Sequence, residues 1–412
     1  MFEIIKLKNL GIELIDGDRG KNYPHQNELM DNGYCLFLSA KNVTTNGFDF
    51  EEKQFISKDK DRILRNGKLV RGDIVVTTRG TVGNVALYDE SVSYENVRIN
   101  SGMLIVRCDS RICKEYLYYV LRSEWFHTKI KAIQTGSAQP QLPKSHFEKM
   151  DIPVPSVDIQ IRIADVIMQF DKKIACNSMI NRNLSEQIAA LYQAWFIDYE
   201  PFKNGDFVDS EVGEIPAGWR VEKLVDLCDT ISKKHKFDKD ELIFLNTGDV
   251  EDGKFLHANY SAVDGMPGQA KKSIKENDIL YSEIRPINRH FAYVNFDAED
   301  YVVSTKLMVI RSKGMDPRRL YQYLTSQSVI DELQLEAESR SGTFPQIRFE
   351  NVGSLKMVVA TDDVEKKYAD LLQQFYAQID KNVIENQRLV ELRDSLLPKL
   401  MSGELDVSDL DI

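Results

Sequence analysis

The most regular pattern of apolar positions lies in residues 158–197, a stretch that contains neither Pro nor Gly. Within it, large apolar residues and two asparagines recur at alternating spacings of three and four. This is the seam of a long helix that packs lengthwise on another helix. The seam consists of Ile167, Phe170, Ile174, Asn177, Asn181, Leu184, Ile188, Leu191 and Trp195. We predict one helix of up to ~60 Å here, at 1.5 Å per residue.

Residues 363–401 repeat the pattern and predict a second long helix. Its seam positions are Leu372, Phe375, Ile379, Asn382, Asn386 and Leu389, before the pattern weakens at Arg393. A buried Asn on such a seam costs stability and fixes register and partner. Because asparagines stand at matching places in both copies, we assign register setting to Asn177, Asn181, Asn382 and Asn386. The alternative is a solvent-facing layer in an ordinary helix.

Residues 1–155 and 215–360 have a different pattern, with short β-rich apolar runs punctuated by Gly, Asn and Pro. Such runs predict strands. The strands are expected at Asp73–Thr78, Met103–Arg107, Asp278–Ser282 and Leu307–Arg311, with helical stretches at Arg111–Ile133 and Pro317–Glu338. Each of these two segments is therefore predicted to be a mixed α/β domain.

The two halves of the chain are related by a repeat at an offset of 203 to 206 residues. Gly72-Asp73-Ile74 matches Asn277-Asp278-Ile279, and Pro140-Gln141-Leu142 matches Pro345-Gln346-Ile347. Many matches in one order predict duplicated structure with pseudo-twofold symmetry.

The expected architecture is α+β, with two mixed domains separated by two long antiparallel helices. The expected boundaries are a first domain at 1–155, a central helix at 156–200, a linker at 201–214, a second domain at 215–360 and a C-terminal helix at 361–412. A helix that leaves the first domain places the second domain at its far end, so the second helix must run back for the seams to pair.

Charge is distributed unevenly along the 412 residues, whose formal net charge is −11. The segments 1–155, 156–214, 215–360 and 361–412 carry net charges of +2, −5, −2 and −6. Acid is concentrated in the helices and linkers, so the near-neutral mixed domains remain compatible with DNA binding. Five cysteines without a C-x-x-C pair indicate a reducing cytoplasm. No apolar run approaches the ~20 residues of a membrane span.

Basic clusters and Arg-containing polar loops are the candidate DNA contacts, because such side chains bind phosphates and base edges. The clusters are Lys58, Lys60, Arg62 and Arg65, and Lys233, Lys234 and Lys236. The loop candidates are Thr77, Thr78, Arg79, Ser137, Gln139, Arg285, Asn288, Arg289, Arg340 and Thr343. The alternative for the clusters is an ordinary solvated surface, and for the loops it is turn chemistry.

Motifs for catalysis are missing. The sequence has no G-x-x-x-x-G-K-[ST] loop, no G-x-G-x-x-G after a strand and no H-E-x-x-H. It also lacks the Asn/Asp-Pro-Pro-aromatic motif of amino-methyltransferases. We therefore predict a non-catalytic protein that binds no metal and no cofactor.

Four segments resemble the specificity (S) subunit of type I restriction-modification enzymes. Met150–Asp165 is similar to the end of a recognition domain running into the spacer helix. Leu191–Phe202 and Ser210–Trp219 resemble the family's central region, and Leu396–Leu405 resembles its C-terminal end. The resemblance covers essentially the whole chain.

The resemblance implies two target recognition domains that each read half of a split double-stranded DNA sequence. It also implies a helical spacer that carries two methyltransferase (M) subunits, joined by restriction (R) subunits. S-adenosylmethionine, ATP and magnesium would belong to those partners. The alternatives are the specificity subunit of a system with a fused nuclease-methylase partner, and a repeat scaffold that binds no DNA.

The second copy departs from the family pattern in two places. Val359-Ala360 stand where the first copy has its Pro-x-Pro element, Pro153–Pro155. Glu365 also replaces the Gln160 of the first copy. We expect the exit from the second domain to differ in angle and its methyltransferase contact to be weaker.

Overall fold

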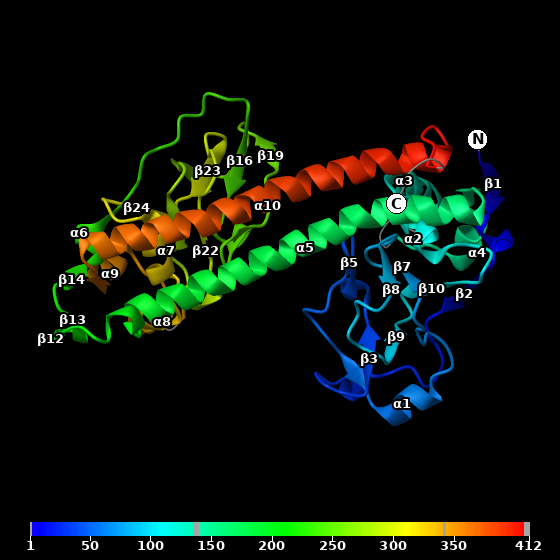
Figure 1. Ribbon diagram of the computed structural model, residues 1–412, viewed down its shortest axis with the longest axis horizontal. Coiled ribbons are helices and arrows are strands. Elements are labelled where there is room, and N and C mark those ends of the chain that lie inside the picture. The colour runs from blue at the N-terminus through cyan, green and yellow to red at the C-terminus, as the bar shows by residue number, and fades with distance from the viewer. Residues whose placement is uncertain (1, 136–139, 341–342, 408–412) are drawn as a thin grey trace. The chain divides into compact units, whose positions relative to one another are not determined.

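The computed structural model describes residues 2–135, 140–340 and 343–407 (Figure 1). The chain forms two compact units. Unit 1 comprises Met1–Ser178 and Asn382–Ile412, and unit 2 comprises Met179–Lys381. Two long helices, α5 (Val157–Phe196) and α10 (Asp362–Ser402), each contribute residues to both units. These helices confirm the two predicted from the seams.

Unit 1 is built on an antiparallel four-stranded sheet. Its order is β2 (Ile12–Asp16), β10 (Met103–Cys108), β7 (Asp73–Thr77) and β8 (Val85–Tyr88). A second sheet has the order β6 (Phe55–Ile56), β3 (Cys35–Leu38) and β9 (Val97–Ile99), with β3 and β9 parallel. The remaining pairs are β1 (Glu3–Lys6) with β11 (Asp151–Val154) and β4 (Val43–Thr44) with β5 (Gly47–Phe48).

The central sheet of unit 1 is buried on both faces. Along β10, Leu104 and Val106 enter the core beneath the helices, while Met103 and Ile105 enter the core beneath the second sheet. Successive side chains point to opposite faces of a strand, so two buried faces require a continuous apolar run. This is why the apolar runs Asp73–Thr78 and Met103–Arg107 correctly predicted β7 and β10.

The predicted helical stretch Arg111–Ile133 is two helices, α2 (Lys114–Arg122) and α3 (Glu124–Ile133). Ser123 between them is extended, and its hydroxyl accepts a hydrogen bond from the Phe126 N–H at 3.2 Å. This N-cap starts a new helix inside the predicted helical stretch. The other helices of the unit are α1 (Lys58–Ile63), α4 (Lys144–Phe147) and the 3₁₀ turns η1 (Leu7–Asn9), η2 (Gln26–Glu28) and η3 (Ala40–Asn42).

Unit 2 repeats this plan. Its central sheet has the order β15 (Cys228–Thr230), β24 (Leu307–Ser312), β21 (Ile279–Ser282) and β22 (Phe291–Tyr293). A second sheet follows the order β19 (Tyr260–Ala262), β16 (Glu241–Leu245), β23 (Tyr301–Ser304) and β20 (Ala270–Ser273), with β16 and β23 parallel. The pair β14 (Arg220–Lys223) and β25 (Lys356–Val359) corresponds to β1 and β11.

The helices of unit 2 also follow unit 1. The predicted stretch Pro317–Glu338 is again two helices, α7 (Pro317–Leu324) and α8 (Gln327–Arg340). The remaining elements are α6 (Leu224–Leu227), α9 (Phe349–Ser354), η4 (Glu200–Phe202), η5 (Thr247–Asp249), η6 (Pro286–Asn288), and the hairpins β12 (Phe207–Ser210) with β13 (Gly213–Pro216) and β17 (Val250–Glu251) with β18 (Lys254–Phe255).

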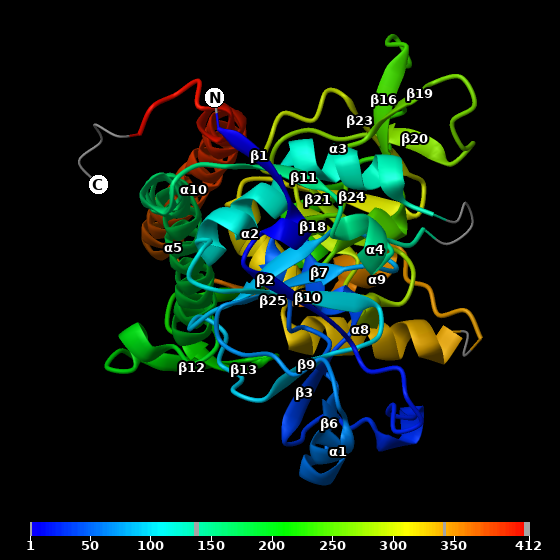
Figure 2. The same ribbon diagram turned by 90° about the vertical axis from the view of Figure 1, so that its right-hand side faces the viewer.

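The long helices run antiparallel inside each unit. In unit 1 Asp171 of α5 faces Arg393 of α10, and further along α5 Asn177 faces Asn386. In unit 2 the Trp195 ring packs on Tyr368 at 5.6 Å between centroids, and Asn181 meets Ile379. Residue numbers therefore rise along one helix as they fall along the other, and both views show α5 and α10 side by side (Figures 1 and 2).

Candidate nucleic-acid interface

Loops from distant parts of the sequence meet at one end of the central sheet of unit 1. The loop after β7 is held there because the backbone N–H groups of Thr78 and Arg79 donate to the Gly102 carbonyl at 2.8 and 3.1 Å. The Thr78 carbonyl in turn accepts from the Leu142 N–H at 3.0 Å. Backbone hydrogen bonds thus hold together three segments of the chain, at Thr78–Arg79, at Gly102 and at Leu142.

The side chains at this end of unit 1 differ in availability. Thr77 is fully buried, and its hydroxyl is bonded to the Thr81 carbonyl, while Thr78 is 7% exposed. Because neither side chain is open to a ligand, we remove both from the candidate contacts. Arg79 is half-buried and stays a candidate. Ser137 and Gln139 lie outside the described residues.

The same end of the unit 2 sheet is built in the same way. The Glu283 N–H donates to the Lys306 carbonyl at 2.9 Å, and the Glu283 carbonyl accepts from the Ile347 N–H at 2.8 Å. Arg285 follows, exposed and left-handed at φ 43°, with its N–H bonded to the Pro345 carbonyl at 3.2 Å. The left-handed backbone at Arg285 turns the chain outward just after the buried end of β21, so the Arg285 side chain is exposed.

The other loop candidates of unit 2 separate into free and engaged side chains. Asn288 and Thr343 are exposed. The Arg289 guanidinium instead bonds Asp252 at 2.9 Å and Gln327 at 3.3 Å, which fixes it against its own unit. Arg340 ends α8, and its side chain is not among those described.

The first basic cluster lies on and after α1. Lys58, Arg62 and Arg65 are exposed. Lys60 differs, because its ammonium pairs with Glu28 at 2.7 Å and its side chain is only 13% exposed. That pairing gives Lys60 an internal role and leaves three exposed cations for a phosphate backbone.

The second basic cluster is assembled from two segments of the chain. Residues 233–235 pair with β20, through the His235 N–H to the Lys271 carbonyl at 2.7 Å and the Ser273 N–H to the Lys233 carbonyl at 3.0 Å. This pairing brings Lys271 to the exposed Lys233, Lys234 and Lys236, and we name these four residues the lysine cluster. Burial lowers the pKa of the neighbouring Lys272, whose ammonium donates to the Thr305 and Leu307 carbonyls.

The asparagines of the seam meet across the helices. In unit 1 the Asn177 amide, 1% exposed, donates to Asn386 Oδ1 at 2.9 Å and to Glu385 at 2.8 Å. In unit 2 the Asn181 amide donates to the Ile379 carbonyl at 3.3 Å. Asn382 is 3% exposed. Because a shift in register would break these hydrogen bonds, the contacts support the register-setting role proposed for the asparagines.

The comparisons with known proteins agree with this duplicated architecture. The family described as "Type I restriction modification DNA specificity domain" matches twice, at residues 2–186 and 216–392. The chain belongs to this family. The two matches coincide with the two copies of the repeat, each a recognition domain followed by most of a long helix.

Relatives of this specificity subunit occur in bacteria and archaea. A type I specificity subunit (HindI) from Haemophilus influenzae is 41% identical over 181 residues, which is 43% of this chain and 39% of that protein. A specificity subunit (MjaIX) from Methanocaldococcus jannaschii is 26% identical over 82% of this chain and 79% of its own. The crystal structure of the S subunit from M. genitalium has the same fold, with a TM-score of 0.56 at 14% identity over 97% of this chain and 96% of its own.

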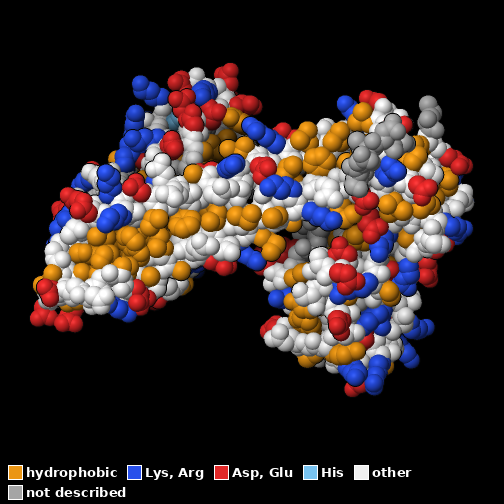
Figure 3. Space-filling view, viewed as in Figure 1, with side chains coloured by type: hydrophobic (Ala, Val, Ile, Leu, Met, Phe, Trp, Pro, Cys, Tyr) orange, Lys and Arg blue, Asp and Glu red, His pale blue; other side chains and the backbone are white. Residues whose placement is uncertain are grey.

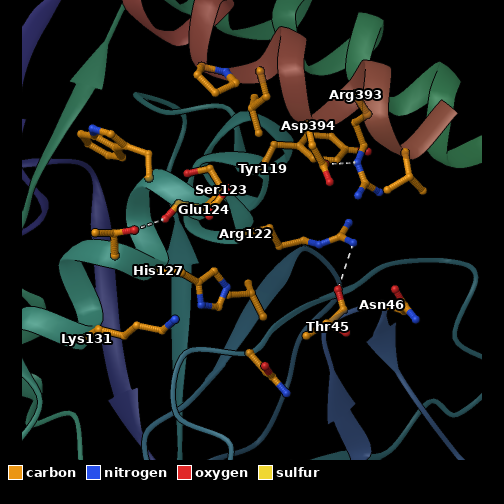
Figure 4. Close-up of a pocket in the computed structure, with 17 residues that line it drawn as sticks. Thr45, Asn46, Tyr119, Arg122, Ser123, Glu124, His127, Lys131, Arg393 and Asp394 are labelled. Carbon is orange, nitrogen blue, oxygen red and sulfur yellow. Dashed lines mark hydrogen bonds and ion pairs between the residues drawn. The ribbon is translucent and has the colours of Figure 1, made fainter. Parts of the chain in front are cut away.

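A cavity of about 670 Å³ lies in unit 1 between α2, α3 and α10 of this specificity subunit (Figure 4). Asp171 is shared by two arginines beside it, Arg122 at 3.1 Å and Arg393 at 2.7 Å, and Arg122 also donates to the Thr45 carbonyl. Burial, together with nearby Lys131 and Arg122, lowers the pKa of His127 in its wall. Sequence reasoning missed this network, because its members are far apart in the chain.

Two further findings concern metals and membranes. In the ranges 2–135, 140–340 and 343–407, no group of three His, Cys, Asp or Glu side chains is arranged to hold a metal ion. Within the same described part of the specificity subunit, no helix has the length and apolar character needed to cross a bilayer.

Proposed function

We propose that this type I specificity subunit reads a split double-stranded DNA target, with one half-site for each recognition domain, 1–155 and 215–360. The observation that carries the proposal is one framework built twice with different loops at the same sheet end. In unit 1 that end holds Arg79 and Thr135, which both pair with Gln141, and in unit 2 it holds Arg285. The lysine cluster lies along β20 of the second sheet of unit 2. A shared framework with different side chains on it is what two different half-sites require.

Partner binding is proposed from the exposed faces of the long helices. Met179 of α5 and Ile384 of α10 occupy matching positions of the repeat, and they are 63% and 51% exposed. Apolar side chains gather along α5 in the space-filling view (Figure 3). Because large apolar side chains in a row indicate a protein interface, two equivalent positions support two copies of one partner. We propose that these partners are the methyltransferase (M) subunits, joined by restriction (R) subunits.

The subunit itself is proposed to be non-catalytic. S-adenosylmethionine, ATP and magnesium would then be bound by the M and R partners. The five cysteines are free thiols, which supports work in the reducing cytoplasm.

Domain exchange tests the proposed function. Residues 1–155 are replaced by the first recognition domain of another specificity subunit, and methylated adenines are mapped in a strain that carries the exchanged chain and its M partner. The expected result is a new first half-site and an unchanged second half-site. A change of both half-sites together would contradict independent reading, and methylation without sequence preference would contradict DNA recognition by this subunit.

A further inference from the structure

Unit 2 holds a fully buried arginine. Arg319, the third residue of α7, is 1% exposed and donates from Nη2 to the Val358 carbonyl of β25 at 3.2 Å. Its Nε and Nη1 atoms have no hydrogen-bond partner among the described residues. A buried cation is costly unless other charges or π faces compensate for the lost water.

Two aromatic rings and one carboxylate from the long helices supply that compensation. The guanidinium lies 3.6 Å from the centroid of the Phe196 ring and 4.9 Å from that of Tyr192, both on α5. Glu365, the fourth residue of α10, places a carboxylate oxygen 4.0 Å from Arg319 Nε. Aromatic faces and a carboxylate both attract a desolvated guanidinium, so the site is matched to a positive charge.

Unit 1 has a neutral set of groups at the matching positions. Tyr116, the third residue of α2, is 0% exposed, and its hydroxyl donates to the Pro153 carbonyl of β11 at 2.8 Å. Gln160, the fourth residue of α5, replaces Glu365 and is 1% exposed. Leu397 and Met401 of α10 replace Tyr192 and Phe196 and belong to the same core as Tyr116. No charge enters this set, and none is needed.

The difference between Gln160 and Glu365 follows from the strand exits. In unit 1 the Gln160 amide donates to the Pro155 carbonyl at 2.9 Å, and Pro155 has no N–H to offer. In unit 2 the matching residue is Ala360, whose N–H donates to the Glu365 carboxylate at 3.0 Å. Gln160 also accepts from the Cys113 N–H at 2.8 Å, so the helix residue both donates and accepts in unit 1, whereas the Glu365 carboxylate only accepts in unit 2.

We propose that these two sets fix which recognition domain occupies which position. Tyr116 and Arg319 belong to the recognition domains, whereas Gln160, Glu365 and the groups around them belong to the helices. A first domain moved to the second position would set a neutral Tyr against Glu365 and leave the carboxylate without its cation. A second domain moved to the first position would bury an Arg beside Gln160, Leu397 and Met401, with neither a counter-charge nor a ring.

This proposal rests on the proposed function, since it presumes two exchangeable recognition domains. The test uses the full chain with its M subunits and a chimera that carries residues 1–155 in both positions. We expect the yield of intact complex and the methylation of its symmetric target to fall at least tenfold, a ratio that corresponds to about 1.4 kcal/mol. Adding Glu365→Gln to the chimera should restore both. Tyr116→Arg together with Pro155→Ala in the second copy of the domain should restore them as well, since Ala returns the N–H that Glu365 accepts.

The reverse chimera carries residues 215–360 in both positions. Gln160→Glu is expected to restore this chain in part, and Gln160→Glu with Leu397→Tyr and Met401→Phe is expected to restore it fully. The natural chain with Asp370→Asn, which removes an exposed carboxylate of α10 outside this set, serves as the control and is expected to assemble normally.

Either of two results would overturn the proposal: full assembly of the unmodified chimeras, or failure of every compensating substitution. Complex yield and resistance to proteolysis report packing without any DNA reading. A failure of DNA recognition in well-assembled chains would therefore count against the proposed function alone.

Discussion

The Asp278 carboxylate accepts two hydrogen bonds from the Arg311 guanidinium, at 2.7 Å from Nε and 2.8 Å from Nη2. Asp278 directly precedes β21 in unit 2 and is 0% exposed. Its carboxylate also accepts a hydrogen bond from the Lys275 N–H at 2.9 Å. Asp73 and Arg107 repeat the arrangement in unit 1, with both bonds at 2.8 Å. Because the pair recurs in both copies, it belongs to the framework and not to DNA reading.

Asp278→Asn should therefore destabilise unit 2. Removing one partner of a buried, two-bonded ion pair leaves the other charge uncompensated, and since Arg311 is partly exposed we expect a loss of about 2–4 kcal/mol in the free energy of unfolding. Denaturant unfolding measures it. The matched control is Asp264→Asn at an exposed position, which should change stability by less than about 0.5 kcal/mol. Equal effects of the two substitutions would contradict the framework role.

His127 should make stability depend on pH near neutrality. Burial, with Lys131 and Arg122 nearby, lowers its pKa below the ordinary 6.5. The unfolded chain therefore takes up a proton at a pH where the folded chain does not. The contribution of His127 to the free energy of unfolding is full above pH 6.5, and it is lost as the pH falls from 6.5 through the pKa of the folded state. Unfolding free energies of wild type and His127→Gln between pH 8 and ~5 should show the weaker acid destabilisation in the variant. An identical pH dependence in both proteins would refute this, and His146→Gln serves as the exposed control.

Asn177→Leu should make the helix pair more stable and less specific. The substitution replaces a buried amide whose Oδ1 has no partner among the described residues, so we expect a gain of about 1 kcal/mol together with looser register. Register can be read from a zero-length amine–carboxylate cross-link between Lys173 and Glu385, which lie 3.3 Å apart. The yield of that link should fall in the variant and stay unchanged in Asn183→Leu, an exposed position of α5. An undiminished link in Asn177→Leu would count against register setting.

The lysine cluster should contribute salt-dependent DNA affinity. Changing Lys233, Lys234, Lys236 and Lys271 to Gln should weaken binding of the assembled complex to all sequences, and each lost phosphate contact should reduce the slope of log K against log salt by ~0.9. The control changes Lys203, Lys223, Lys254 and Lys275, which are exposed elsewhere in unit 2. Loss of affinity only for the specific target would mean that the cluster reads bases instead.

The paired helices are expected to set the spacer between the half-sites. A heptad inserted after Leu184 in α5, with a second heptad near Tyr376 in α10, keeps the seam in phase and adds ~10.5 Å of helix. At ~3.4 Å per base pair, we expect the spacer to lengthen by roughly one to three base pairs. Methylation mapping should find both half-sites unchanged. An unchanged spacer in an active complex would be incompatible with this role.

The sequence by itself determined the repeat, the two long helices and two strands of each central sheet, β7 and β10 in unit 1 and β21 and β24 in unit 2. The helix prediction is unambiguous because apolar residues recur at spacings of three and four over most of a 40-residue stretch without Pro or Gly. The clusters of basic residues were also visible, because their members are close in sequence. The sequence predicted that Arg111–Ile133 is helical but did not locate the break between α2 and α3, since one Ser cap does not interrupt the apolar pattern.

Only the tertiary structure decided which of these side chains are available. Thr77 reads in sequence as a polar loop residue, but the sheet end encloses it and its neighbours bind its hydroxyl. Lys271 and Lys233 come together through strand pairing. Arg319 contacts Phe196, which is more than a hundred residues away in sequence, and Glu365, which is 46 residues away. Local periodicity reports which face of an element is buried. Contacts between elements distant in sequence depend on chain packing, which no local pattern encodes.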